Sequence, residues 1–291
     1  MASFQGMKIN PSRFHKSQLK FYLFLVPMTL FVALPIIFII SHAFKPSNEL
    51  FAYPPKFFVR VPTFDNFTDL FDLAAESGIP FSRYLFNSLF VTIIGVFLSV
   101  LITSLAAYSL SKLKFKGKKA LFEINNLALM FVPIAVTIPR YLTIAEVGLI
   151  DNYLVLILPL IAMPVGLFLV KQFIDQTPNE LIESAKIDGA SEMQIFLKII
   201  IPIVAPALAT VGILSFQLIW NDTVGSTLYM NDDSLKTLAF YFSTLGARTG
   251  NTVAGQGIMA AASLISFLPN IIIFIFLQGK VMNTMAHSGI K

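Results

Sequence analysis

The chain has 291 residues, of which 56% are hydrophobic and only 13% are charged, about half the roughly 25% charged residues of a soluble domain. So few charges cannot cover a water-exposed surface, which argues against a soluble enzyme or a nucleic-acid-binding domain. Cysteine is absent and the three histidines are scattered. Neither a disulfide framework nor a metal site is therefore predicted, and no residue pattern indicates a cofactor.

Six stretches nearly free of charged residues follow one another along the chain, each close to the roughly 20 residues that a helix needs to cross a bilayer. They predict membrane-spanning helices near residues 21–44, 85–110, 121–143, 152–172, 199–221 and 258–279. The third includes Glu123 near one end. The first ends at Ser41-His42-Ala43, the form of a signal-peptide cleavage site, but its apolar run is longer than a signal peptide needs. We therefore expect a retained anchor.

Basic residues are divided unevenly between the segments that join these spans. Fourteen Lys and Arg residues fall on the side of the two termini and seven on the other side, so the positive-inside rule places both termini in the cytoplasm. The lysines between Lys112 and Lys119 are then a topology anchor and not a nucleic-acid patch. The expected organisation is a cytoplasmic N-terminus (1–20), a first transmembrane helix (21–44), an extracytoplasmic segment (45–84), a five-helix core (85–280) with a cytoplasmic loop (173–198), and a cytoplasmic tail (281–291).

Two longer segments are expected outside the membrane. In the first, apolar residues recur at helical spacing, which predicts a short amphipathic helix on the membrane or against a partner: Phe64, Phe67, Leu70, Phe71 and Ala74. The second runs from Asn221 to Gly257 and contains a turn-prone acidic tip, 231–234. The apolar residues after this tip are expected to pack it onto the membrane domain: Leu235, Leu238, Phe240 and Tyr241. A solvated connector is the alternative for the tip itself.

The most specific pattern lies between spans four and five. Thr177 with Glu180 forms a capping-box sequence around Pro178, which predicts a helix start. Gly189 is expected to end that helix in the left-handed conformation, and Ser191 with Gln194 offers a second capping box. Two apolar faces are predicted, one in each helix: Leu181, Ile182 and Ala185, then Met193, Phe196, Leu197 and Ile200. The pattern indicates two helices joined by a glycine hinge and positioned to fill a groove on another protein.

This segment resembles the signature loop of permease subunits of binding-protein-dependent ABC importers. The resemblance rests on Glu183-Ser184-Ala185, Gly189 after three residues, Ile199 after nine more, and Ile201-Pro202 after one more. Ser184 and Ile201 stand where the family usually has alanine and leucine. The extended form Ile187-Asp188-Gly189-Ala190 is typical of the carbohydrate-importing branch. Further motifs are similar to the maltose-type second permease: Asn87-Ser88-Leu89, Ala106-Ala107-Tyr108, Phe115-Lys116-Gly117-Lys118, Trp220-Asn221-Asp222 and the Gly289-Ile290-Lys291 end.

The resemblance implies an all-α membrane protein with six transmembrane helices, the transmembrane domain of a type I ABC importer in a bacterial cytoplasmic (inner) membrane. It implies a heterodimer with a second permease, two ATP-binding cassette subunits, and an extracytoplasmic binding protein that delivers a sugar or oligosaccharide. It also implies that the outer loop before span six reaches into the docked binding protein. The residues expected to couple to the ATPase are Glu183, Ser184, Ala185, Asp188, Gly189, Ala190, Phe196 and Pro202.

The chain itself lacks the G-x-x-x-x-G-K-[ST] phosphate loop, so we expect ATP hydrolysis to reside in other chains and this chain not to be an enzyme. A sugar path through the spans would use amide and aromatic side chains, for which the candidates are Asn87, Gln217, Trp220 and Asn221. The same side chains could instead hydrogen-bond between helices. An ion-coupled secondary transporter is the alternative function, although the spans offer only Glu123 as an acidic group. A membrane-embedded enzyme would need paired catalytic residues, which are not seen.

Overall fold

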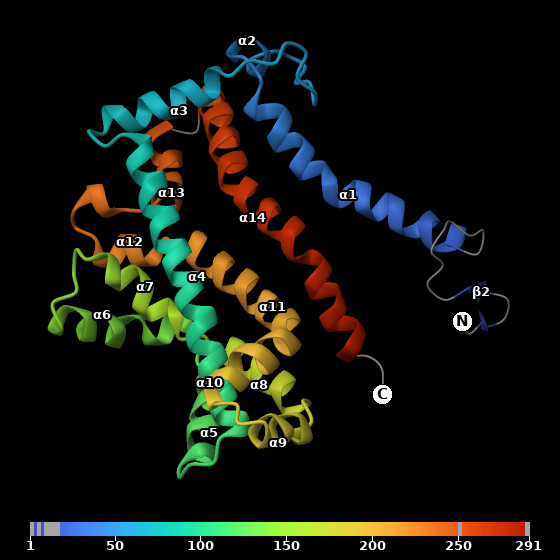
Figure 1. The fold of residues 1–291 in the computed structure, drawn as a ribbon. Helices are drawn as coiled ribbons and strands as arrows, with labels where there is room; N and C mark the ends of the chain where they lie inside the picture. Colours follow the sequence, from blue (N-terminus) through green and yellow to red (C-terminus); the bar gives the residue numbers. More distant parts are fainter. Residues whose placement is uncertain (1–2, 5–6, 9–17, 250–251, 289–291) are drawn as a thin grey trace. The chain divides into compact units, whose positions relative to one another are not determined.

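The computed structural model describes residues 3–4, 7–8, 18–249 and 252–288, and most of them are helical (Figure 1). The predicted cytoplasmic residues Arg13 and Lys16, and the 289–291 end, lie outside the described residues. Two short antiparallel strands, β1 (Ser3–Phe4) and β2 (Met7–Lys8), pair near the N-terminus. The chain forms two compact units, Met1–Leu70 with Thr249–Leu264 and Phe71–Arg248 with Ile265–Lys291.

The first unit is built around α1 (Leu19–Ala43), a 25-residue helix whose side chains are mostly exposed and apolar. It is followed by α2 (Ser47–Leu50) and by the start of α3 (Asp65–Glu76), and it also contains the first turns of α14 (Val253–Ser288). The end of α1 packs its Ala43 against Ala260 and Ala261 of α14. The Asn66 amide donates to the carbonyl oxygens of Ala43 (3.0 Å) and Lys45 (2.8 Å), which fixes the chain direction after α1.

The second unit contains the remaining helices. They are α4 (Phe81–Lys112), α5 (Lys118–Ala128), η2 (Pro133–Val136), α6 (Thr137–Glu146), α7 (Tyr153–Ile161), α8 (Pro164–Asp175), α9 (Asn179–Ile187), α10 (Glu192–Ile195), η3 (Phe196–Ile200), α11 (Ile201–Trp220), α12 (Val224–Tyr229), η4 (Asp233–Leu235), α13 (Leu238–Thr249) and the rest of α14. The central helix of this unit is α4, which packs against α7, α8 and α11 (Figure 1).

Among the described residues, four helical segments are long and apolar enough to span a bilayer: α1, α4, the continuous segment Glu192–Trp220, and Val253–Gly279 of α14. They coincide with the predicted first, second, fifth and sixth spans. Two further spans arise only if bent helix pairs are counted, α5 with η2 and α6 (bend of 108°) and α7 with α8 (bend of 44°). The fold is therefore that of an all-α membrane protein with up to six spans.

The predicted spans 121–143 and 152–172 are each interrupted before a proline and are not single continuous helices. The third segment leaves the helical path after Ala128, and the short helix η2 then begins at Pro133. The fourth is broken at Ala162 and Met163, just before Pro164. Proline lacks the N–H that would bond to the carbonyl four residues earlier, and it restrains the residue before it to an extended conformation. Hydropathy reports that such a segment is apolar but not that it changes direction.

Two apolar cores hold the second unit together, one toward each end of α4. Near its C-terminal end, Tyr108 and neighbours pack with side chains of α8 to α11: Val170, Ile174, Ile182, Ile195, Phe196, Ile200 and Val204. Near its N-terminal half, Val91 packs with α6, α7, α11 and α12 through Ile144, Val155, Leu156, Ile157, Ile219 and Tyr229. The helix hairpin α9–α10 and the loop between α12 and α13 are each built on one of these cores.

Candidate functional site

The helix hairpin between α8 and α11 has the glycine hinge that the sequence predicts. Helix α9 ends at Ile187, and Gly189 follows with φ of +81°. The Ala190 N–H donates to the Ala185 carbonyl (2.9 Å) and closes the end of the helix. A residue with a Cβ is strained at this φ, which is why glycine is favoured here.

Of the two predicted capping boxes, one is confirmed and one is wrong. Ser191 Oγ accepts from the Gln194 N–H (3.3 Å), while Gln194 Oε1 accepts from the Ser191 N–H (2.8 Å). At the start of α9, by contrast, Pro178 occupies the cap position and makes no side-chain cap bond. Thr177 instead belongs to the turn that ends α8, where its N–H donates to the Ile174 carbonyl (3.0 Å). Its hydroxyl, buried in that turn, does not cap α9.

The predicted apolar faces of the hairpin are divided between the core and the surface. Ile182, Phe196 and Ile200 are buried, but Leu181, Met193 and Leu197 are about half exposed. Ile187, next to the hinge, is 87% exposed. The prediction that Met193, Phe196, Leu197 and Ile200 share one face is wrong, because the buried positions are instead Ile195, Phe196, Ile200 and Val204.

A π-helical turn explains this change of face. Residues Phe196–Ile200 form the π-helix η3 within the continuous span Glu192–Trp220. Pro202 follows two residues later and cannot donate to the Lys198 carbonyl, so a regular α-helix would leave that carbonyl unpaired and in contact with the proline ring. A wider turn accommodates the proline and shifts the phase of the side chains before it.

A polar link that sequence reasoning missed joins the hairpin to α4. The Tyr108 hydroxyl donates to Glu192 Oε2 (2.6 Å), and Lys186 Nζ lies 2.6 Å from Glu192 Oε1. The Tyr108 ring is buried and packs on Phe196, with 5.5 Å between ring centroids. Tyr108 stands in a family motif, but its partner 84 residues later cannot be found by local spacing.

A second link attaches the start of α9 to the end of α4. Lys112 Nζ donates to the Thr177 carbonyl (2.7 Å) and to Asn179 Oδ1 (2.9 Å). Ser111 donates to Asp175, which also pairs with Lys171 (2.6 Å). The hairpin is therefore attached to α4 on both sides of its hinge.

The eight predicted coupling residues all lie on or beside this hairpin, with different exposures. Glu183, Ser184, Asp188 and Gly189 are exposed, Ala185 and Ala190 are partly buried, Phe196 is buried, and Pro202 is exposed in the first turn of α11. A groove of about 380 Å³ runs beside the hinge, lined by Asp188, Gly189, Ala190, Gln194, Ile195, Lys198 and Ile199. The hairpin thus offers both apolar and polar groups at its surface.

At the other end of the unit, the acidic tip is bound to the rest of the chain and is not a loose connector. The Asp151 carboxylate accepts from the N–H groups of Asn231 (2.6 Å) and Asp232 (3.0 Å) and from the Asn231 amide (3.1 Å). These donors, first of all the Asp232 N–H, hold the pKa of Asp151 below its ordinary value. Arg83 Nε donates to the Ser234 carbonyl (2.9 Å). Leu238 and Tyr241 are buried after the tip, as predicted.

Asn87 also binds the segment that follows the acidic tip. Its side chain is fully buried; its amide nitrogen donates to the carbonyls of Ser234 (2.9 Å) and Lys236 (2.8 Å), and its amide oxygen accepts from the Tyr153 hydroxyl (2.7 Å). Both ends of the amide are therefore occupied by the chain itself, and Asn87 holds the loop in place.

The other three candidate path residues lie together at the end of α11. The Trp220 ring is buried and stacks on Phe216 with 5.7 Å between centroids, and its Nε1 donates to the Ser266 carbonyl (3.1 Å). Gln217 and Asn221 are exposed, and the Asn221 amide donates to the Gln217 carbonyl (2.8 Å). Next to them, burial raises the pKa of Asp222, which accepts from the Gly225 N–H (3.0 Å).

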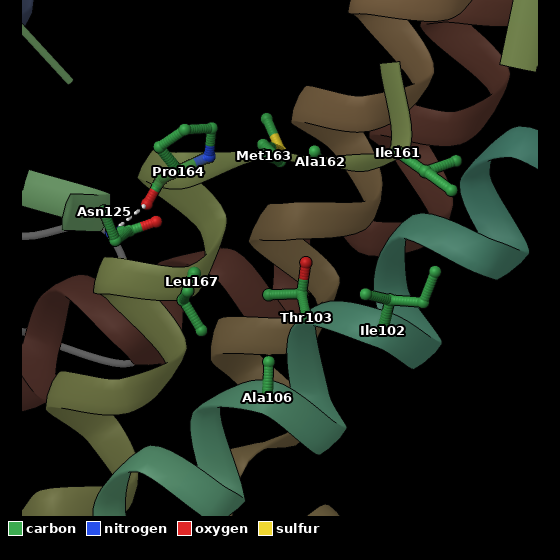
Figure 2. Close-up of a pocket in the computed structure, with 9 residues that line it drawn as sticks. All are labelled: Ile102, Thr103, Ala106, Asn125, Ile161, Ala162, Met163, Pro164 and Leu167. Atoms are coloured by element: carbon green, nitrogen blue, oxygen red, sulfur yellow. Dashed lines mark hydrogen bonds between the residues drawn. The ribbon is translucent and has the colours of Figure 1, made fainter. Parts of the chain in front are cut away.

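A smaller cavity of about 180 Å³ lies at the break between α7 and α8 (Figure 2). Asn125 of α5 donates to the Pro164 carbonyl (3.2 Å), and Thr103 of α4 lines the same space (Figure 2). Irregular backbone at membrane depth is stable only where protein or water satisfies its polar groups, and Asn125 supplies a side-chain donor beside this break.

Comparison with known proteins identifies the family to which this fold belongs. Residues 99–279 match the family described as "Binding-protein-dependent transport system inner membrane component". The chain is 34% identical to a putative ABC transporter permease protein, ORF2, of Caldicellulosiruptor sp. (strain Rt8B.4), over 93% of this chain and 96% of that protein. It is 30% identical to the arabinooligosaccharides transport system permease protein AraQ of Bacillus subtilis (strain 168), over 92% and 94% of the two chains. A chain of a bacterial ABC transporter crystal structure, involved in alginate import, has the same fold with a TM-score of 0.77 and 23% identity, over 92% of this chain and 99% of that one. The chain is thus a permease subunit of the binding-protein-dependent transport system inner membrane component family.

Proposed function

We propose that this permease subunit imports a sugar or oligosaccharide and that it does so as half of a heterodimer with a second permease. Two ATPase subunits on the cytoplasmic side supply the energy, and an extracytoplasmic binding protein supplies the substrate. The carbohydrate class is supported by the Asp188-Gly189-Ala190 pattern and by the arabinooligosaccharide permease among the relatives. Both termini lie in the cytoplasm, as the distribution of basic residues supports.

The observation that carries the proposal is the surface of the α9–α10 hairpin. Ile187, Met193 and Leu181 are exposed there although apolar, and the hinge between them is fixed by Gly189. Exposed apolar groups on a charged and well-ordered hairpin are typical of a protein contact. Tyr108 and Lys112 connect the hairpin to α4, so a movement of the hairpin by the ATPase is transmitted to a membrane span.

For the substrate path we propose Gln217 and Asn221, with Trp220 holding the local fold of α11. Both amides are exposed and suit the hydroxyls of a sugar. The Trp220 ring is stacked on Phe216 and its N–H is used by Ser266. Asn87 is left out of the path because its amide is occupied by the outer loop and Tyr153.

Cross-linking tests the hairpin contact, since the chain has no cysteine of its own. A single cysteine at Ile187 or Met193 should cross-link to an ATPase subunit in membranes that contain the assembled transporter. A cysteine at Ile182 is the matched control, because that residue belongs to the same hairpin but is buried. Failure of both exposed positions to cross-link, in a transporter active in uptake of labelled oligosaccharide, would reject the contact.

A second experiment tests the transport function itself. Uptake of labelled arabinooligosaccharides by vesicles should require ATP and the binding protein, and should persist when ion gradients are collapsed. Uptake that depends on an ion gradient and not on ATP would instead establish the secondary transporter.

A further inference from the structure

The loop between α2 and α3 has its backbone tied to the end of α1. Ser41 Oγ donates to the Phe57 carbonyl (2.8 Å) and accepts from the Val59 N–H (2.9 Å). The Glu49 carboxylate accepts from the N–H groups of Arg60 and Val61 (2.9 Å each). These bonds, that of Arg60 first, hold the pKa of Glu49 below its ordinary value, so the carboxylate keeps its charge at neutral pH. The buried Lys45 ammonium donates to the Lys56 carbonyl.

Several apolar side chains of this loop are exposed. We define the aromatic loop as residues 53–61. Within it Tyr53 is 96% exposed, Phe58 66% and Val61 64%. Water-exposed loops rarely carry such a group of apolar side chains. A loop in which several backbone groups are already bonded and several apolar side chains are exposed is suited to an environment poorer in water.

The position of the aromatic loop along α1 identifies that environment. The ring centroid of Phe57 lies 5.7 Å from that of Phe38 and 5.0 Å from that of Phe58. Phe38 stands five residues before the end of α1 at Ala43, which is roughly 7.5 Å along the helix axis. The loop therefore folds back beside the last turns of a membrane span. At that level aromatic side chains concentrate between lipid headgroups and hydrocarbon.

An apolar groove of about 450 Å³ begins where the loop meets α1. It is lined by Phe31, Val32, Leu34, Pro35, Phe38 and Phe57. Its lining is almost entirely hydrocarbon and follows one side of the helix, which suits an extended acyl chain. Lys56 and Arg60 of the loop are exposed and carry the charge that a lipid phosphate attracts. A sugar would need convergent polar groups, and the Glu49 carboxylate beside the loop is already bonded to its backbone.

We propose that the aromatic loop is an interfacial lipid anchor, which inserts Tyr53 and Phe58 into the leaflet at the Ala43 end of α1 and holds a phospholipid acyl chain in the groove closed by Phe57. The anchor fixes the depth of α1 and joins the extramembrane part of the first unit to the lipid surface. This assignment depends on α1 being a span and not on the substrate or the coupling partners.

Fluorescence quenching tests the anchor in the full-length chain, with the subunits that copurify with it, in lipid nanodiscs. A bimane probe on Phe58→Cys should lose most of its fluorescence to lipids that carry a quencher just below the headgroup, and little to aqueous iodide. The matched control is Asp69→Cys on α3, an exposed position of the same unit, which iodide should quench. Quenching of the Phe58 probe by iodide as at position 69 would overturn the proposal. Protection from both quenchers would overturn it too, because a protein would then cover the loop.

Lipid retention tests the groove separately. After extensive detergent washing, Phe57→Ala should retain less phospholipid by native mass spectrometry than the unsubstituted chain. Phe64→Ala is the control, because Phe64 is exposed in the same unit but does not line the groove. Equal phospholipid retention in the two variants would show that the groove does not hold an acyl chain.

Discussion

Gly189 is the residue on which the geometry of the hairpin depends most directly. A Cβ added there would meet nothing within 4 Å, so a substitution acts through the backbone alone. At φ of +81° a β-branched residue costs roughly 1–2 kcal/mol or more. Gly189→Val should therefore misdirect the hairpin and abolish uptake while the chain still inserts in the membrane. Gly189→Asn should retain most uptake, because asparagine tolerates this conformation. Equal transport by the valine and asparagine variants would show that transport does not depend on the positive φ at this residue.

Tyr108 shows how one hydroxyl can join the hairpin to a span. Tyr108→Phe keeps the ring on Phe196 but removes the donor to Glu192. Because Glu192 is half exposed, we expect a loss of only about 1 kcal/mol in stability. The larger effect should be on the number of substrate molecules imported per ATP hydrolysed, measured in proteoliposomes. Tyr141→Phe on α6 serves as the control. If the number of substrate molecules imported per ATP is unchanged in the Tyr108 variant, the Tyr108–Glu192 bond contributes only to packing.

At the scale of elements, the loop between α12 and α13 is bound to α4 through Asn87, which Tyr153 of α7 holds in turn, and it is not a separate connector. Asn87→Ala would leave the Lys236 carbonyl and the Tyr153 hydroxyl without the Asn87 partner, while the Ser234 carbonyl would keep only Arg83. Each buried group left unpaired costs about 1–3 kcal/mol. The thermal unfolding midpoint in detergent should fall clearly. Tyr153→Phe removes one of the three bonds and should lower it less. Equal midpoints for the two variants would mean that the loop is held mainly by Leu238 and Tyr241.

The elements that could be predicted from sequence are those that depend on short-range patterns. Long apolar runs identified α1, α4, α11 and α14, and the Ser191–Gln194 box identified the start of α10. The angles of the bends near Pro133 and Pro164 could not be predicted, because a proline signals an interruption without giving its angle. Contacts such as Asp151 with Asn231 were missed because they join residues 80 positions apart. Asn87 was assigned to the sugar path since a polar residue in a span has the same appearance whether it binds substrate or backbone.

For the whole molecule, the topology prediction can be tested with accessible positions that the structure selects. In intact cells, single cysteines that replace Lys56 or Asp233 should react with a membrane-impermeant maleimide. Cysteines that replace Lys116 or Lys186 should react only after the cells are permeabilised. All four positions are exposed. Asp233 is preferred to the nearby Lys236, because the Lys236 side chain is only 15% exposed. Labelling at 116 or 186 in intact cells, without labelling at 56 or 233, would show that the chain has the opposite orientation.

The π-helical turn at Phe196–Ile200 gives the span Glu192–Trp220 a property that a regular helix lacks. It holds one residue more than the α-helical turn that it replaces, and one residue corresponds to about 100° of rotation around the helix axis. Conversion of this turn to α-geometry would therefore rotate α10 and the hairpin relative to α11 while the span stays continuous. The helix therefore contains a built-in change of register. Because of it, α10 and the hairpin can rotate without bending or unwinding the part of the helix that crosses the membrane.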